Sequence, residues 1–179
     1  TGITESLLKK TDAKPRHAYL GRLLTFIVLG FLQSTLVGLG DLFYLQIQYV
    51  DPVRFMISVW FTSLVFVNIM YAFTYAFGDI GKAICVFLLV IQVAGAGGSF
   101  PVQMLPESFQ VINPLLPFVH AIAAMHENIA GYYGNVWISE LGALSIFLAA
   151  SLMLGLVLRK PTAKLNAWII EKLEDTKIM

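Results

Sequence analysis

Three side chains in the second half of the chain have the chemistry of metal ligands. His120, His126 and Glu127 lie close together in the sequence. Two ligands on one helix face are typically four residues apart, as in the HExxH motif, whereas these two histidines are six apart. The spacing argues against a metal site. Lipid headgroups or neighbouring helices are the expected partners of both histidines.

Other catalytic signatures are missing from the sequence. Cys85 is the single cysteine and lies in an apolar run, where a buried, small apolar role is expected. The chain contains no GxxxxGK[ST] loop, so it cannot itself supply ATP hydrolysis. No nucleophile and base have a spacing that supports catalysis. We therefore predict that the chain is not an enzyme and needs no cofactor.

The elements that carry these residues are expected to lie in a lipid bilayer. Hydrophobic residues make up 58% of the 179 positions and charged residues 13%, and the mean hydropathy is +0.75. An ordinary soluble domain has roughly 25% charged residues. We predict an all-α integral membrane protein, with the bilayer and not nucleic acid as its partner. The four predicted spans, each near the roughly 20 residues that cross a bilayer, are about 23–45, 54–77, 80–96 and 136–158.

Basic residues gather at the two ends of the chain. Five of the 12 Lys and Arg residues precede residue 23, and five follow residue 158. Because cytoplasmic flanks are enriched in Lys and Arg, both termini are predicted to be cytoplasmic in a multi-pass plasma-membrane protein. Thr1 begins the sequence without a signal-peptide core, so we expect the natural product to extend upstream. The predicted parts are a basic cytoplasmic segment (1–22), the transmembrane domain (23–158) and an amphipathic cytoplasmic tail (159–179).

The stretch Gln92–Gly131 is apolar but repeatedly interrupted by Gly and Pro. Non-helical backbone at membrane depth must be satisfied by protein or by a water-filled cavity, so such a segment is a candidate for function. Two short helices are predicted, each with Pro near its start. Together they form an outer re-entrant hairpin over 99–131, between the third and fourth spans. The residues that shape it are Gly98, Pro101, Pro106, Asn113, Pro114, Pro117 and Gly131.

The second hairpin helix has a clear apolar face. We predict that face from four residues at helical spacing, with three polar residues off it. The apolar residues are Phe118, Ile122, Met125 and Ile129, and the off-face residues are His120, Glu127 and Asn128.

Small residues repeat every four positions in the first span. Gly30, Ser34 and Gly38 share one helix face, which lets another helix backbone approach closely. That helix belongs either to the same chain or to a second copy in a homodimer, and both alternatives stay open.

Several polar residues lie within the spans or at their ends. Gln33 and Asn68 are expected to hydrogen-bond to neighbouring helices, with substrate lining as the alternative. Asp41 and Glu140 lie near the outer ends, where an acid reaches water, and ionisable residues there are functional candidates. Asp79 is expected to be the N-cap of the third span.

Three motifs carry a resemblance to a known family. These are FGDIGKA (Phe77–Ala83), the long run GAGGSFPVQMLPESFQVINPLLPFVHAIAAMHENIAG (Gly95–Gly131) and GLVLRKP (Gly155–Pro161). Together they resemble the C-terminal membrane domain of the YhgE/Pip (phage infection protein) family. That family is similar to the type-2 ABC exporter permeases.

The resemblance implies a fold and two functions. The four spans would be the last four helices of a permease, which pairs as a dimer. An earlier transmembrane helix, a large ectodomain and one more helix would precede Thr1. One function is a permease that moves an amphiphilic or polymeric substrate with a separate ATPase. The alternative is a non-transporting membrane anchor of a phage receptor or of a type VII secretion accessory protein. By analogy, the residues that would dock an ATPase on the cytoplasmic face are Lys9, Lys10, Arg16, Asp79 and Lys82.

Overall fold

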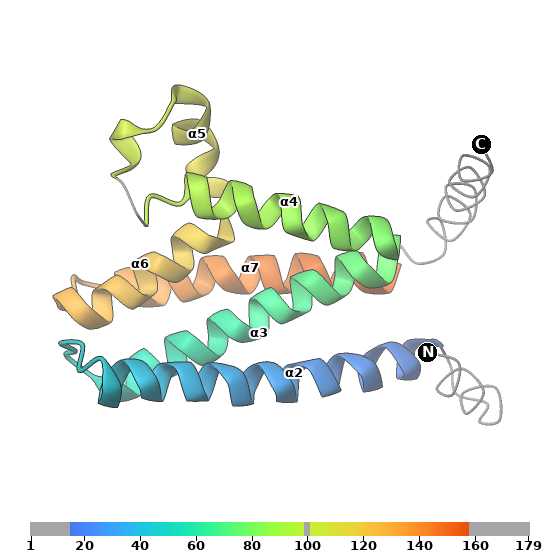
Figure 1. Ribbon diagram of the computed structural model, residues 1–179, viewed down its shortest axis with the longest axis horizontal. Helices are drawn as coiled ribbons and strands as arrows, with labels where there is room; N and C mark the ends of the chain where they lie inside the picture. Colours follow the sequence, from blue (N-terminus) through green and yellow to red (C-terminus); the bar gives the residue numbers. More distant parts are fainter. Residues whose placement is uncertain (1–14, 99–100, 158–179) are drawn as a thin grey trace.

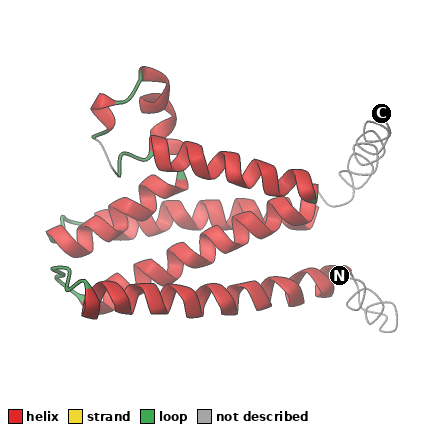
Figure 2. Ribbon diagram, in the orientation of Figure 1, coloured by secondary structure: helices red, strands yellow, loops and turns green. Residues whose placement is uncertain are grey.

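The computed structural model describes residues 15–98 and 101–157, and every regular element in these ranges is helical (Figures 1 and 2). The all-α fold predicted from the sequence is therefore confirmed. In chain order the elements are α2 (Pro15–Leu39), η1 (Gly40–Tyr44), α3 (Pro52–Phe77), α4 (Asp79–Gly95), η2 (Val102–Met104), α5 (Glu107–Ile112), η3 (Asn113–Leu115), α6 (Pro117–Ala130) and α7 (Val136–Val157).

Three of the described helices are long and apolar enough to cross a membrane. They are Tyr19–Tyr44, which joins α2 to η1, Pro52–Phe77 and Val136–Leu156, with 26, 26 and 21 residues. The apolar helix α4 has 17 residues. At 1.5 Å per residue it is about 25 Å long, slightly less than the roughly 30 Å of a bilayer core. The third predicted span therefore exists as a helix but is the shortest of the four.

Helix α3 lies at the centre of the bundle and packs against α2, α4, α6 and α7 (Figure 1). The start of α2 and the end of α7 lie together, since the Tyr19 ring packs against Gly155. We call this the termini end. The opposite end, which carries the loops before α3 and before α7, is the hairpin end. A buried cluster of Val65, Ala121 and Leu144 joins α3, α6 and α7.

The turns between the long helices have local causes. The Asp51 carboxylate accepts hydrogen bonds from the backbone N–H groups of Val53 and Arg54, at 2.9 and 3.4 Å, and so caps α3. Gly78 turns the chain from α3 into α4 with φ of 61°, a value that favours glycine. Gly78 is therefore the N-cap of α4 and Asp79 is the first helical residue, so the expected cap at Asp79 is wrong by one position.

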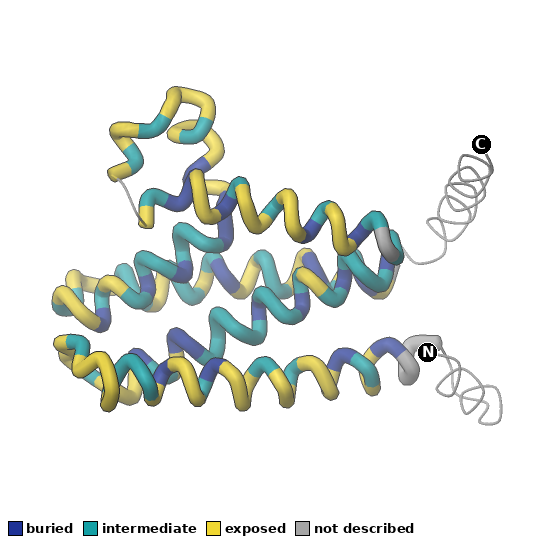
Figure 3. Tube along the Cα trace, viewed as in Figure 1, coloured by how far each residue is buried: buried dark blue, intermediate teal, exposed yellow. Residues whose placement is uncertain are grey.

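The surface of the bundle is apolar, as a lipid environment requires. Large hydrophobic side chains on the outer faces of α2, α4 and α7 are exposed (Figure 3), including Leu36 at 75% and Ile146 at 70% of their accessible area. A soluble monomer rarely exposes so continuous an apolar surface. The interior, in contrast, holds several polar side chains: Ser34, Ser58, Asn68, Gln92, Asn113, Asn128 and Ser151.

The small residues of α2 lie against α3. A Cβ atom at Gly30 would be 2.7 Å from Val67 Cγ2, and one at Gly38 would be 2.8 Å from Met56 Sδ. Ser34 is buried between them and donates to the Phe31 carbonyl oxygen of its own helix. A homodimer that used this face would have to displace α3.

Asn68 and Gln33, which were each expected to hydrogen-bond to a neighbouring helix, differ in position. The Asn68 amide on α3 donates to Ser151 Oγ and to the Leu148 carbonyl oxygen on α7, as expected for a residue that joins helices. Gln33 lies on the exposed side of α2.

Candidate functional site: the root of the hairpin

The segment between α4 and α7 contains a sharply bent pair of apolar helices. Its two main helical parts, Glu107–Leu115 and Pro117–Ala130, meet at an angle of 74°. The residue between them, Leu116, is extended, with φ of −91° and ψ of 120°, because the ring of Pro117 disfavours helical geometry at the preceding residue. Gly131 ends α6 with φ of 110°. We call Val102–Ala130 the hairpin.

Proline residues define the parts of the hairpin. Pro101 precedes η2, and Pro106 is the N-cap of α5. Pro114 lies inside η3, and Pro117 is the first residue of α6. The structure thus places these prolines at or next to the starts of the short helices, and Pro106 directly precedes the first residue of α5.

The bend of the hairpin is attached to the end of α4. Asn113, which is buried, donates its amide N–H to the Gly95 carbonyl oxygen at 2.7 Å. Carbonyl groups in the last turn of a helix have no partner within that helix, so Asn113 satisfies a group that would otherwise be buried without one. Gly95 also permits close packing, because a Cβ atom there would be 2.9 Å from Leu116 Cδ1 and 3.1 Å from Phe109 Cδ1.

Gly98 makes a second close approach on the same side of the hairpin. A Cβ atom at this position would be 3.0 Å from Ile122 Cδ1 on α6. The glycines after α4 therefore lie where the hairpin folds back on the bundle.

The same bend is attached to α7 through His120 and Glu140. His120 Nδ1 lies 2.6 Å from Glu140 Oε2, and His120 Nε2 lies 3.1 Å from the Pro114 carbonyl oxygen. The two side chains are only about one-fifth exposed, at 19% and 22%. The imidazole therefore joins η3, α6 and α7. The sequence did not pair these residues, because Glu140 was expected to reach water.

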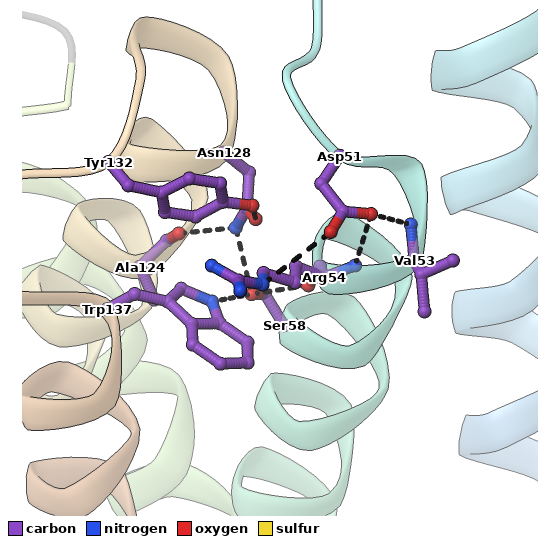
Figure 4. Close-up of polar contacts among 8 residues, drawn as sticks. All are labelled: Asp51, Val53, Arg54, Ser58, Ala124, Asn128, Tyr132 and Trp137. Atoms are coloured by element: carbon purple, nitrogen blue, oxygen red, sulfur yellow. Dashed lines mark hydrogen bonds and ion pairs between the residues drawn. The ribbon is translucent and has the colours of Figure 1, made fainter. Parts of the chain in front are cut away.

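The far end of α6 is attached to α3 by a buried polar network (Figure 4). Asn128 is fully buried and donates to Ser58 Oγ at 3.0 Å and to the Ala124 carbonyl oxygen at 2.6 Å. Ser58 Oγ also accepts the indole N–H of Trp137 at 2.8 Å. The three helices α3, α6 and α7 thus meet at one hydroxyl group.

Arg54 covers this network on the side of the loops. Its guanidinium carbon lies 4.5 Å from the centre of the Tyr132 ring and 5.5 Å from that of Trp137, within the range of cation–π contacts. Arg54 Nε is 3.5 Å from Asp51 Oδ2. The Tyr132 hydroxyl donates to Asn128 Oδ1 at 2.7 Å. Burial is the largest cause of the raised pKa of Tyr132. The charges of Asp51 and Glu127 raise this pKa further, and Arg54 lowers it.

Comparison with known proteins identifies the family. The family described as "ABC-2 family transporter protein" matches residues 6–157. The chain belongs to the ABC-2 transporter family. Protein YhgE of Bacillus subtilis (strain 168), which is described as uncharacterized, is 29% identical over 134 residues. That match covers 73% of this chain but 17% of YhgE. No solved structure matches the chain.

The ABC-2 match supports the YhgE-like membrane domain that the sequence motifs suggested. ABC-2 membrane components are the transporter part of their complexes and are generally not catalytic. Within residues 15–98 and 101–157, no three His, Cys, Asp or Glu side chains gather as a metal site would require. His126 is exposed on α6.

Two of the docking residues expected for an ABC-2 partner, Asp79 and Lys82, lie at the termini end. Lys82 is exposed near the start of α4, and Asp79 begins that helix. Lys9 and Lys10 lie outside the described residues, as does the side chain of Arg16. Docking through these residues stays a prediction.

Asn128 is the main residue of this ABC-2 domain that sequence reasoning placed incorrectly. The buried face of α6 consists of Pro117, Ala121, Ala124 and Asn128, whereas the expected apolar face is only partly covered. The signal was present in the sequence, since these small and polar residues recur at spacings of four, three and four. Small residues and polar groups are typical of helix contacts in membranes.

Proposed function

We propose that this chain is the membrane-spanning part of an ABC-2 exporter. It would move an amphiphilic or polymeric substrate out of the cell, driven by a separate ATP-binding subunit. The observation that carries the proposal is the family match over residues 6–157, which includes every described helix. ABC-2 membrane components generally work with ATP-binding subunits in a bilayer.

The charge distribution supports an orientation for this domain. The described ends of α2 and α7 lie at the same end of the bundle (Figure 1), and the sequence has five Lys and Arg residues before residue 23 and five after residue 158. By the positive-inside rule, we propose that this side is cytoplasmic. The hairpin end would then face outward, where Arg54 is stacked on aromatic rings and paired with Asp51.

The dimensions of the hairpin support a role at the outer exit. Helix α6 has 14 residues, about 21 Å of helix, and α5 has six, so neither crosses a core of roughly 30 Å. Apolar side chains of the hairpin are strongly exposed, with Met104 at 76%, Val111 at 75% and Leu115 at 70%. Such a surface suits the outer leaflet or the apolar part of an amphiphilic substrate. We therefore assign to the hairpin the shaping of the membrane exit.

A pull-down of the full-length protein from its own membranes tests the proposal. We expect an ATP-binding subunit to co-purify and its ATPase activity to rise in the complex. The triple variant Lys9→Glu, Lys10→Glu, Arg16→Glu should reduce this association. The matched control reverses three charges on the tail instead, at Lys164, Lys172 and Lys177. Undiminished association in the first triple variant would refute docking on the N-terminal segment.

A second candidate is a membrane anchor for a larger surface protein. The match covers only 17% of YhgE, so most of that relative lies outside the part shared with this chain. An anchor requires no ATP-binding partner. The absence of such a subunit and of stimulated ATPase activity in the same experiment would favour the anchor over the exporter.

A further inference from the structure

The His120 ring lies between two hydrogen-bond acceptors. Nδ1 faces the Glu140 carboxylate at 2.6 Å, and Nε2 faces the Pro114 carbonyl oxygen at 3.1 Å. A carbonyl oxygen has no proton to donate, so the second contact requires a proton on Nε2. At the first contact a proton must lie between the imidazole and the carboxylate. Both contacts therefore form together only when the imidazole and the carboxylate carry two protons in total. One proton is on Nε2 and the other lies between Nδ1 and Glu140.

We propose that His120 and Glu140 form a proton-binding site that controls the bend of the hairpin. With both protons present, the imidazole holds η3 through Pro114 and α7 through Glu140. When one proton leaves to water, a neutral imidazole with a single N–H remains beside a carboxylate. The carboxylate is the stronger acceptor, so the N–H turns to Glu140 and the Pro114 contact is lost.

The proton, and not a metal ion, is the ligand that fits this site. A distance of 2.6 Å between Nδ1 and Oε2 is that of a direct hydrogen bond and leaves no room for an ion between them. Within the described residues, no third His, Cys, Asp or Glu side chain joins the pair. Histidine is also the side chain that changes charge between about pH 5 and 8.

The other ionisable groups near this end have separate partners or positions. On α6 itself, His126 is exposed and Glu127 accepts the backbone N–H of Tyr133 at 2.8 Å. Asp51 and Arg54 on the α3 side contact each other and the aromatic rings. Glu107 is exposed at the start of α5, and α4 has its charged residues, Asp79 and Lys82, in its first turn. Glu140 is the charged group that the structure shows in contact with His120.

The site would make the hairpin respond to the pH of the compartment that it faces. Loss of the proton removes one of the two polar attachments of the arm formed by α5 and η3, so the arm is held less firmly, while Asn113 still donates to Gly95 and α6 keeps its contacts with α3. If the hairpin shapes an export exit, the position of this arm at the exit depends on the protonation of the site. This consequence depends on the proposed transport function, but the proton-dependent bend does not.

Hydrogen exchange of the full-length protein in lipid nanodiscs tests the proposal. Uptake by the segment 109–116 is compared at about pH 5.5 and about pH 8.5, either side of the usual range of histidine, after correction for the intrinsic exchange rate. We expect roughly tenfold faster exchange at the higher pH, since one charge-assisted hydrogen bond is lost. Peptides from α3 should show no such change.

Three variants distinguish a proton site from simple packing. In Glu140→Gln the amide N–H donates to Nδ1 of a neutral imidazole, so both contacts persist and exchange should be slow at both pH values. In His120→Ala exchange should be fast at both. His126→Gln, the matched control, should keep the wild-type dependence.

Two results would overturn the proposal. One is corrected exchange in the wild type that is the same at both pH values. The other is a Glu140→Gln variant that keeps the full pH dependence, because its site has no carboxylate to compete for the proton. Neither result depends on transport or on an ATP-binding subunit, so a failure here is separate from a failure of the proposed function.

Discussion

Replacement of Asn113 by Ala should loosen the hairpin far more than replacement of Gln110. Both amide side chains donate to a backbone carbonyl oxygen at nearly the same distance, Asn113 to Gly95 at 2.7 Å and Gln110 to Leu105 at 2.8 Å. Asn113 is buried, whereas Gln110 is exposed. Water can replace the lost donor at Leu105 but not at Gly95.

The expected magnitudes follow from this difference in burial. A carbonyl group that is left buried without a donor costs about 1–3 kcal/mol. Asn113→Ala should therefore speed exchange of the amides in segment 109–116 by roughly 5- to 150-fold. Gln110→Ala should cost about 0.5 kcal/mol or less and change exchange by no more than about threefold. Asn113→Asp should be at least as disruptive as Asn113→Ala, since a carboxylate cannot donate.

The measurement is hydrogen exchange of the full-length protein in nanodiscs at one fixed pH, with peptides from α3 as an internal reference. Equal, small effects of the Asn113→Ala and Gln110→Ala variants would refute the argument from burial. An Asn113→Asp variant that behaves like the wild type would show that donation to Gly95 does not hold the bend.

Three further changes test other contacts by thermal unfolding in detergent. Asn128→Asp should lower the Tm more than Asn128→Ala, because a carboxylate oxygen would face the carbonyl and hydroxyl oxygens to which the amide now donates; the reverse order would contradict the network. Gly155→Ala should destabilise the fold by about 1–3 kcal/mol, because the new Cβ would overlap the Tyr19 ring that packs against this glycine. Gly142→Ala is the control: there is open space around Gly142, so this change should be neutral or should stabilise the fold by up to about 1 kcal/mol. Equal Tm values for the two glycine variants would rule out that close approach. Because the pKa of Tyr132 is raised, its neutral form stabilises the fold at pH values below the usual tyrosine pKa of about 10. This contribution is lost as the pH rises above that value. The Tm of Tyr132→Phe should therefore fall less between about pH 9 and 11 than the Tm of the wild type.

The helices and the hairpin could be predicted because their causes are local. Hydropathy alone indicates α2, α3 and α7, since a span must supply about 20 apolar residues in a row. Proline restricts its own backbone and that of the preceding residue, so Pro114 and Pro117 indicate the bend directly. The cap at Asp51 with Pro52 is equally local. Gly78 instead of Asp79 as the cap of α4 was missed because either residue could fill that position.

The contacts at the root of the hairpin could not be predicted, because they depend on how the helices are rotated. Asn128 and Ser58 are 70 residues apart, and His120 and Glu140 are 20 apart. The rule that an apolar face points to the interior also fails here. Lipid is as apolar as Leu, so a large apolar residue gains little by leaving it, and the small residues and polar groups of α6 occupy the interior instead.

The attachments of the hairpin differ in a way that suggests which part moves. At the far end of α6, Asn128 is fully buried and bonded to Ser58 and Tyr132, and its carbonyl oxygen accepts the backbone N–H of Val50 at 2.8 Å. At the bend, the attachments are one amide from Asn113 and the partly exposed His120. The bend therefore has fewer polar contacts than the far end of α6, and one of them is only partly buried. We therefore expect α6 to stay fixed at Asn128 while the arm of α5 and η3 detaches first, so that a small energy input at the bend opens the hairpin without unfolding the bundle.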